Sequence, residues 1–289
     1  MEHADWEEAL KAYREDRSSG AMALADQAAA ILERWAQSYP EGQLTSFLTE
    51  LEGLLQAVRE AHPDMAPLLH LIETARQAVR GASAIEAARA ALVAAIQAFQ
   101  RRLKAHERAA ARHAASLLRS ARVILTHSRS GTVARTLALA AQRGRRLQVV
   151  CSIAEPGGEG RQMSEEVAAM GHTAVLLPDF AAAHWIPHVD LVLVGADAWD
   201  EEGIVNKIGT LALAVMARAF QRPFFVVAIS EKRWPPWAGP HHARQGPPSL
   251  PGGEIPWFEF VPRTYITGLI LEDGVHLTWA ASFPRDADP

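Results

Sequence analysis

Ser128, Arg129, Ser130 and Gly131 are the first group of residues whose types and spacing suit chemistry. They follow the apolar run "VILTH" and precede a helix-like pattern, "TVARTLALAAQRG". Backbone N–H groups at a helix start attract anions, and neighbouring hydroxyl and guanidinium groups can complete a phosphate site. Serines also cap helices without binding any ligand. The pattern therefore leaves two interpretations open, a phosphate cradle and a simple cap.

A second group follows the apolar run "DLVLVG", in the segment "ADAWDEEGIVNKIGT". Asp197 lies just past that predicted strand, and Asn206 and Lys207 are expected to open the next helix. Ligands of parallel sheets bind outside the carboxyl ends of the strands. An aspartate at such an end and a lysine at a helix start therefore suit acid–base work beside an anionic ligand. The alternative is a capping aspartate and a surface lysine.

The third group is "DRSSGAMALA", near the N-terminus, with Arg17, Gly20 and Ala21. Hydroxyl residues and a glycine precede a helix that is expected to begin at Ala21, in the same order as in the first group. Alone, this pattern fits a helix cap. Together with the other two groups, it favours an anion site shared between two parts of the chain.

Histidine and cysteine show no comparable pattern. His184 and His188 are four residues apart, but Pro187 lies between them, so they need not share a helical face. Cys151 is the only cysteine, which excludes an intramolecular disulfide and a cysteine-based zinc site. No complete P-loop or dinucleotide-binding fingerprint is present. We therefore expect neither a metal nor a cofactor.

The secondary structure that must position these residues changes near residue 120, from helices alone to alternating strands and helices. Before it, apolar residues recur at three- and four-residue spacing, which predicts helices over 21–39, 44–62, 65–81 and 83–120. After it, short β-rich runs alternate with helix-like segments, which predicts an α/β fold with a parallel sheet covered on both faces. The runs are "RVILTH", "LQVVCSI", "TAVLLPD", "DLVLVGAD", "PFFVVAIS" and "FEFVP".

Bulk composition narrows the class of protein. The chain has 289 residues, 49% of them hydrophobic and 21% charged, as is usual for globular proteins. A net charge of -4 argues against a general nucleic-acid binder. The acidic start "MEHADWEEAL" is unlike a signal peptide, and no long uncharged apolar run is present, so we expect a cytoplasmic protein.

The stretch 232–256 holds seven of the seventeen prolines and predicts a long loop, either a lid or partner contact or a passive surface.

Whole motifs add a resemblance to a known family. "GADAWDEEGIVNKIGT" closely resembles the GAD…G…NKIGT signature of the family that unites three groups: the alpha, beta and delta subunits of eukaryotic translation initiation factor 2B, methylthioribose-1-phosphate isomerase and ribose-1,5-bisphosphate isomerase. "DRSSGAMALA", "ILTHSRSG", "PGGEGRQMS" and "FEFVPRTYITGLILEDGV" resemble its other motifs, in the right order and over nearly the whole chain.

The resemblance implies a helical domain over 1–118, ending in a long connecting helix, and a Rossmann-like domain with a mainly parallel sheet over 119–289. It also implies a ligand cleft between the domains, and dimers or higher homo-oligomers formed through the C-terminal domains. The positions implied to bind the ligand are Arg17, Gly20, Ala21, Ser128, Arg129, Ser130, Asn206 and Lys207.

Two positions depart from the isomerases that this chain resembles. Ser128 stands where those enzymes have a cysteine, which works with the aspartate that corresponds to Asp197. A thiol with a pKa of about 8.5 exchanges protons near neutrality, and an unactivated serine hydroxyl does so far less. Glu155 stands where an arginine usually serves the phosphate, and Arg129, Arg161 or Arg17 would have to compensate.

The sequence therefore favours a protein like the alpha subunit of initiation factor 2B, which binds a phosphorylated sugar or nucleotide without cysteine-dependent isomerase chemistry. Two alternatives stay open. An active aldose–ketose isomerase acting on a sugar 1-phosphate would use Asp197 for proton transfer, with Ser128 orienting the substrate. A scaffold would contact protein partners through "KRWPPWAGPHHARQGPP". We expect neither membrane nor direct nucleic-acid binding.

Overall fold

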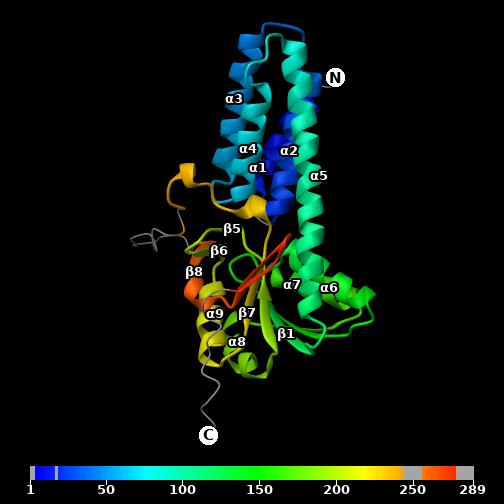
Figure 1. Ribbon diagram of the computed structural model, residues 1–289, viewed down its shortest axis with the longest axis vertical. Coiled ribbons are helices and arrows are strands. Elements are labelled where there is room, and N and C mark those ends of the chain that lie inside the picture. The colour runs from blue at the N-terminus through cyan, green and yellow to red at the C-terminus, as the bar shows by residue number, and fades with distance from the viewer. Residues whose placement is uncertain (1–3, 17–18, 242, 244–255, 278–289) are drawn as a thin grey trace. The chain divides into compact units, whose positions relative to one another are not determined.

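The computed structural model describes residues 4–16, 19–241, 243 and 256–277 (Figure 1). Most of the proline-rich segment therefore lies outside the described residues. The chain divides into two compact units. Unit 1 comprises residues 1–105 with 235–239, and unit 2 comprises residues 106–234 with 240–289. The domain boundary near residue 118 stays a prediction.

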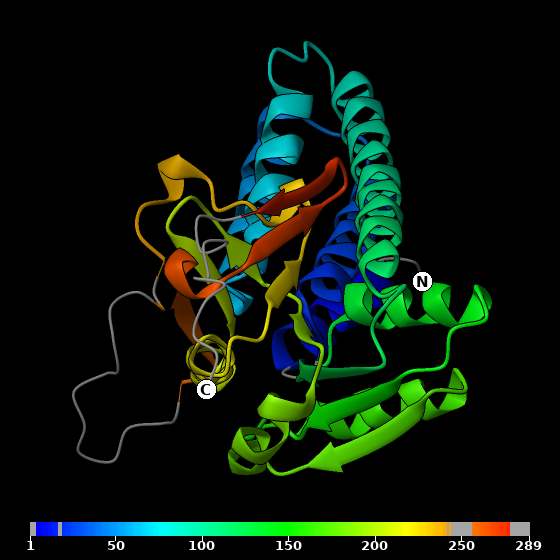
Figure 2. The ribbon, with the colours of Figure 1, turned by 60° about the horizontal axis from the view of Figure 1, so that its bottom comes forward.

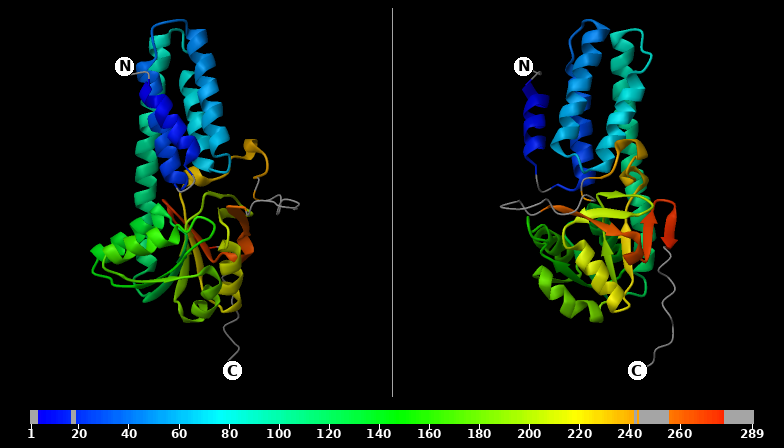
Figure 3. Two further views of the ribbon diagram at one scale, coloured as in Figure 1. Left: turned by 180° about the vertical axis from the view of Figure 1, so that it is seen from behind. Right: turned by 90° about the vertical axis from the view of Figure 1, so that its left-hand side faces the viewer.

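Unit 1 is built from helices that lie alongside one another (Figure 3). They are α1 (Ala4–Glu15), α2 (Ala21–Ser38), α3 (Leu44–Ala61), α4 (Ala66–Val79) and the first part of α5 (Ile85–Leu117). The four later helices fall within the windows that the apolar spacing predicted. Aromatic rings fill part of this core, where Trp35 stacks on Phe47 with ring centroids 4.9 Å apart.

Unit 2 contains a seven-stranded sheet in the order β10-β9-β7-β4-β1-β2-β3, which is parallel except for the antiparallel pair β9 and β10. Its members are β1 (Val123–His127), β2 (Gln148–Ser152), β3 (Thr173–Leu177), β4 (Leu191–Val194), β7 (Phe224–Val227), β9 (Gly268–Leu271) and β10 (Gly274–Leu277). Figure 2 shows β1, β2 and β3 side by side in green. The predicted α/β class with a helical N-terminal part and a mainly parallel sheet is confirmed.

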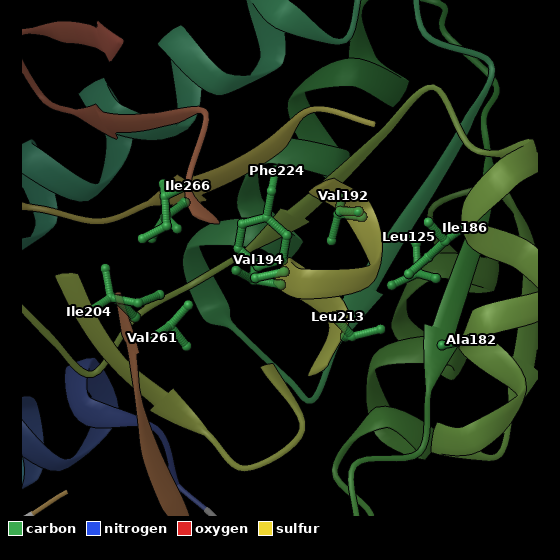
Figure 4. Packing of buried hydrophobic residues seen from close by; sticks show 14 of the residues in the cluster. Leu125, Ala182, Ile186, Val192, Val194, Ile204, Leu213, Phe224, Val261 and Ile266 are labelled. Carbon is green, nitrogen blue, oxygen red and sulfur yellow. The ribbon is translucent and has the colours of Figure 1, made fainter. Parts of the chain in front are cut away.

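In the described part of unit 2, the sheet is accompanied by the end of α5 and by α6 (Gly131–Gln142), α7 (Gly160–Ala169), α8 (Ala182–Trp185) and α9 (Thr210–Ala219). Side chains from α8 and α9 pack against the inner strands in one apolar cluster (Figure 4). The members labelled there include Leu125, Ala182, Ile186, Val192, Val194, Leu213 and Phe224. Strands that are buried in this way need continuous apolar runs, which explains why their sequences are uniform rather than alternating.

Two details of the predicted sheet are wrong. "FEFVP" forms β8 (Phe258–Pro262), but β8 belongs to a separate antiparallel sheet with β5 (Ala198–Trp199) and β6 (Gly203–Lys207). Asn206 and Lys207 end β6 and do not open a helix, because they pair with Glu259 and Phe258 of β8. The chain turns at Gly209, whose φ of 99° favours glycine, and α9 begins one residue later.

In the described part of the chain, no helix combines the length and the apolar composition that a bilayer crossing requires.

Replacement of Phe224 by alanine tests the core of unit 2. Phe224 is 1% exposed within the cluster, so its loss leaves a cavity, and we expect the free energy of unfolding to fall by about 3–5 kcal/mol. Urea denaturation followed by circular dichroism measures the change. Phe220→Ala is the matched control, because Phe220 is 47% exposed and its loss should cost less than about 0.5 kcal/mol. Equal losses in the two variants would contradict this account of the core.

Candidate functional site

The turns after β1 and β4 meet at the carboxyl edge of the sheet, since these two strands are parallel neighbours. Ser128 follows β1 with a φ of 59°, a left-handed conformation that is uncommon for serine. Ser130 caps α6 and accepts a hydrogen bond from the Val133 N–H at 3.4 Å. A side chain at Gly195 would lie 2.4 Å from the Ser130 hydroxyl, so only glycine fits there. The first and second predicted groups thus converge at one edge.

His127 ties three segments together beneath this edge. It is 2% exposed, and its Nε2 donates to the Ile208 carbonyl at 2.7 Å while its Nδ1 accepts from the Ser152 hydroxyl at 2.6 Å. Burial lowers the pKa of His127, mainly by removing water from the charged form. Gly209 lies so close that a side chain there would be 2.9 Å from the imidazole. A neutral His127 therefore positions the turn that follows Lys207.

Lys207 is buried, and protein groups surround its ammonium. Nζ donates to the Pro156 carbonyl and, at 2.9 Å, to Glu159 Oε1. It also lies 4.0 Å from the centre of the Trp257 ring, in cation–π contact. The other Glu159 oxygen accepts from the Ser128 hydroxyl at 3.4 Å. One carboxylate therefore connects two of the predicted ligand-binding residues.

The arginines near this edge also have acidic partners. Arg129 Nε lies 2.7 Å from Glu166 Oε1, and these side chains are 29% and 27% exposed. Arg161 lies 3.7 Å from Glu155, and both of these side chains are exposed. The structure thus places Arg129 in an ion pair with Glu166, which the sequence analysis did not predict.

The start of α9 holds a protein carboxylate. Glu259 accepts from the Leu211 N–H at 2.8 Å and also from the N–H groups of Gly209 and Thr210. Burial is the main effect on its carboxyl and raises the pKa, although these hydrogen bonds oppose the rise. Asn206 donates to the Thr210 hydroxyl at 3.0 Å, which joins β6 to the same helix start. From the sequence, the N–H groups at this helix start are expected to bind an external anion. In the structure they donate to Glu259.

Lys232 is a buried residue that the sequence reasoning did not single out. It is 5% exposed and donates to the Ala196 carbonyl at 2.6 Å, directly before Asp197. Burial lowers its pKa, while the negative charges of Asp197 and Glu107 raise it. Because it opens the proline-rich segment, its sequence context predicted only a loop. The signal that could have identified Lys232 is its position shortly after the apolar strand β7, at the same edge of the sheet.

The N-terminal group lies in unit 1. Gly20 caps α2, and Ala21, its first residue, is 1% exposed. The Ser19 N–H donates to Asp16 Oδ1 at 2.9 Å, which shapes the chain before the helix. Arg17 lies outside the described residues.

Among the described residues, no cluster of three or more histidine, cysteine, aspartate or glutamate side chains could hold a metal ion.

Known proteins resemble this chain over most of its length. Ribose 1,5-bisphosphate isomerase of Haloferax volcanii is 27% identical over 275 residues, which cover 88% of this chain and 83% of that one. A 5-deoxyribose 1-phosphate isomerase of Moorella thermoacetica is 30% identical over 258 residues, with coverage of 79% and 74%. The solved translation initiation factor eIF-2B of Pyrococcus horikoshii OT3 has the same fold, with a TM-score of 0.79, 24% identity and coverage of 96% and 98%.

A family model described as the initiation factor 2 subunit family matches residues 17–235. The matched stretch contains the turn after β1, the turn after β4, Glu159 and Lys207, whereas Trp257 and Glu259 lie beyond it. This chain belongs to the initiation factor 2 subunit family.

Proposed function

We propose that this protein binds a phosphorylated sugar or nucleotide at the carboxyl edge of the sheet of unit 2, without cysteine-dependent isomerase chemistry. The observation that carries the proposal is the pairing of Ser128 with Lys207 through one carboxylate, Glu159. A hydroxyl and an ammonium that share one anionic group are suited to share a phosphate. Asp197 would contact sugar hydroxyls, and Arg17, Arg129 and Ser130 would add phosphate contacts.

The absence of a usable thiol supports binding over catalysis. Ser128 occupies the turn after β1, where the isomerases that this chain resembles have their cysteine. Cys151 is fully buried within β2, and burial raises the pKa of its thiol to about 12. Such a thiol is almost entirely protonated near neutral pH, so it cannot replace the missing group.

An isomerase that uses Asp197 is the second candidate. Relatives named as ribose 1,5-bisphosphate and 5-deoxyribose 1-phosphate isomerases favour it. Asp197 directly follows Ala196, whose carbonyl accepts from the Lys232 ammonium, and its negative charge opposes the lowering of the Lys232 pKa by burial. In this version Asp197 would move the proton after ring opening and Ser128 would only orient the substrate.

Phosphorus NMR separates the two candidates. With catalytic protein and either ribose 1,5-bisphosphate or methylthioribose 1-phosphate, we expect no ketose-phosphate signal, because no acidic thiol is available. With stoichiometric protein, we expect the signals of a bound ligand to broaden. Turnover by the wild-type protein would favour the isomerase, and its loss in Asp197→Asn would assign the role to that carboxylate. Spectra that stay unchanged at both protein concentrations would count against both versions for these ligands.

Lys207→Met tests the proposed phosphate contact. Loss of a charge-assisted hydrogen bond costs about 1.5–3 kcal/mol, so we expect affinity for the bound sugar phosphate to fall at least about tenfold. Isothermal titration calorimetry measures the change, and a thermal melt checks the fold. Lys104→Met is the control, since its side chain is 58% exposed on α5. If both variants bind alike, Lys207 does not hold the ligand.

We also propose that the chain forms a homodimer or a higher homo-oligomer through its C-terminal domain, as its resemblance to the family implies. Sedimentation velocity tests this proposal, and a single species with the mass of one chain at every concentration would contradict it. The scaffold hypothesis concerns residues 232–248, of which 242 and 244–248 lie outside the described residues, and it stays a hypothesis.

A further inference from the structure

The Glu159 carboxylate lies where an external anion would meet two of the proposed ligand contacts. Oε1 is 2.9 Å from Lys207 Nζ, and Oε2 is 3.4 Å from the Ser128 hydroxyl. A carboxylate and a phosphate both present neighbouring oxygens that share negative charge, so each can accept from an ammonium and a hydroxyl at once. The two anions would therefore compete for the same donors.

The ammonium of Lys207 has three N–H donors and, among the described residues, three partners. The partners are the Pro156 carbonyl, the Glu159 carboxylate and the face of the Trp257 ring. A phosphate can reach this ammonium only if one partner leaves. The carbonyl belongs to the backbone and the ring is one rigid group, whereas the Glu159 side chain rotates about three bonds. Glu159 is also the only partner that would repel the incoming charge.

The loop before α7 is shaped to admit this side chain. Gly157 has a φ of 106°, and a side chain there would lie 2.5 Å from Glu159 Oε1 and 2.7 Å from the Trp257 ring. Glycine therefore leaves the space that the carboxylate and the indole occupy. The Glu159 side chain is itself only 13% exposed.

We propose that Glu159 is an internal competitor for the ligand's phosphate. Its carboxylate holds the donors of Ser128 and Lys207 in the unliganded protein and has to rotate away before a phosphate binds there. This inference rests on the proposed function. Its consequence is selectivity: inorganic phosphate supplies too few contacts to displace the carboxylate, whereas a sugar phosphate adds contacts through the rest of the molecule.

Glu159→Gln, titrated with inorganic phosphate by calorimetry, tests the proposal. Glutamine keeps the size of the side chain but removes the competing charge, so we expect phosphate to bind at least about tenfold more tightly than to the wild type. Glu165→Gln is the matched control, because it removes the same charge from an exposed side chain on α7, the helix that Glu159 caps. Solvent screens that charge, so the control should change affinity less than about twofold. Equal affinities in the two variants, or weaker binding by Glu159→Gln, would overturn the proposal.

Two further variants guard against indirect effects. The double variant Glu159→Gln with Lys207→Met should lose the gain, since the released donor belongs to Lys207. If Glu159→Gln does not fold, as judged by circular dichroism, Glu159→Ala replaces it. Alanine removes the competing carboxylate, so tighter phosphate binding is again expected, and unchanged binding would contradict the competitor.

The outcomes also separate this proposal from the proposed function. A gain in phosphate affinity without any sugar phosphate bound to the wild type would support the competitor and count against the function. Binding of a sugar phosphate by the wild type, with no gain in Glu159→Gln, would leave the function standing and reject the competitor.

Discussion

The buried ammonium of Lys207 is the constraint on which the site depends. A charge removed from water is costly unless partners surround it. Lys207 meets this demand with Glu159, the Pro156 carbonyl and the Trp257 ring, which come from two different stretches of chain. The loop after β2 and the chain before β8 must therefore lie close to the end of β6. The need to pair one charge thus determines much of the local arrangement.

The parallel sheet supplies the frame for this arrangement. Its inner strands are apolar on both faces, so polar side chains can only collect where the strands end. His127 lies at that edge but is buried, and burial favours its neutral form. Its two ring nitrogens join β1 to β2 and to the turn before α9. This fixed turn holds Lys207 in place. The residues that stabilise this edge therefore include those that we propose to contact the ligand.

Local patterns in the sequence were sufficient for much of the architecture. Apolar spacing located α2 to α5, and continuous apolar runs located the inner strands, because these signals reflect burial of each element by itself. The same signals failed for Asn206 and Lys207, whose neighbourhood contains the helix-opening residues Gly209 and Thr210. Their strand conformation comes from pairing with β8, some fifty residues later in the chain. A strand that depends on a distant partner leaves little local signal.

The sequence by itself determined which residue types stand at the sheet edge, since Ser128, Asp197 and Lys207 follow recognisable strands and motifs. Its resemblance to the isomerases also implied that Ser128 stands at their cysteine position. Only the tertiary structure decided how their charges are balanced. Glu159 pairs with Lys207 across 48 residues and Glu166 pairs with Arg129 across 37, while Glu259 fills the start of α9. Such pairings arise when distant segments pack and buried charges must find partners, and no local pattern encodes them.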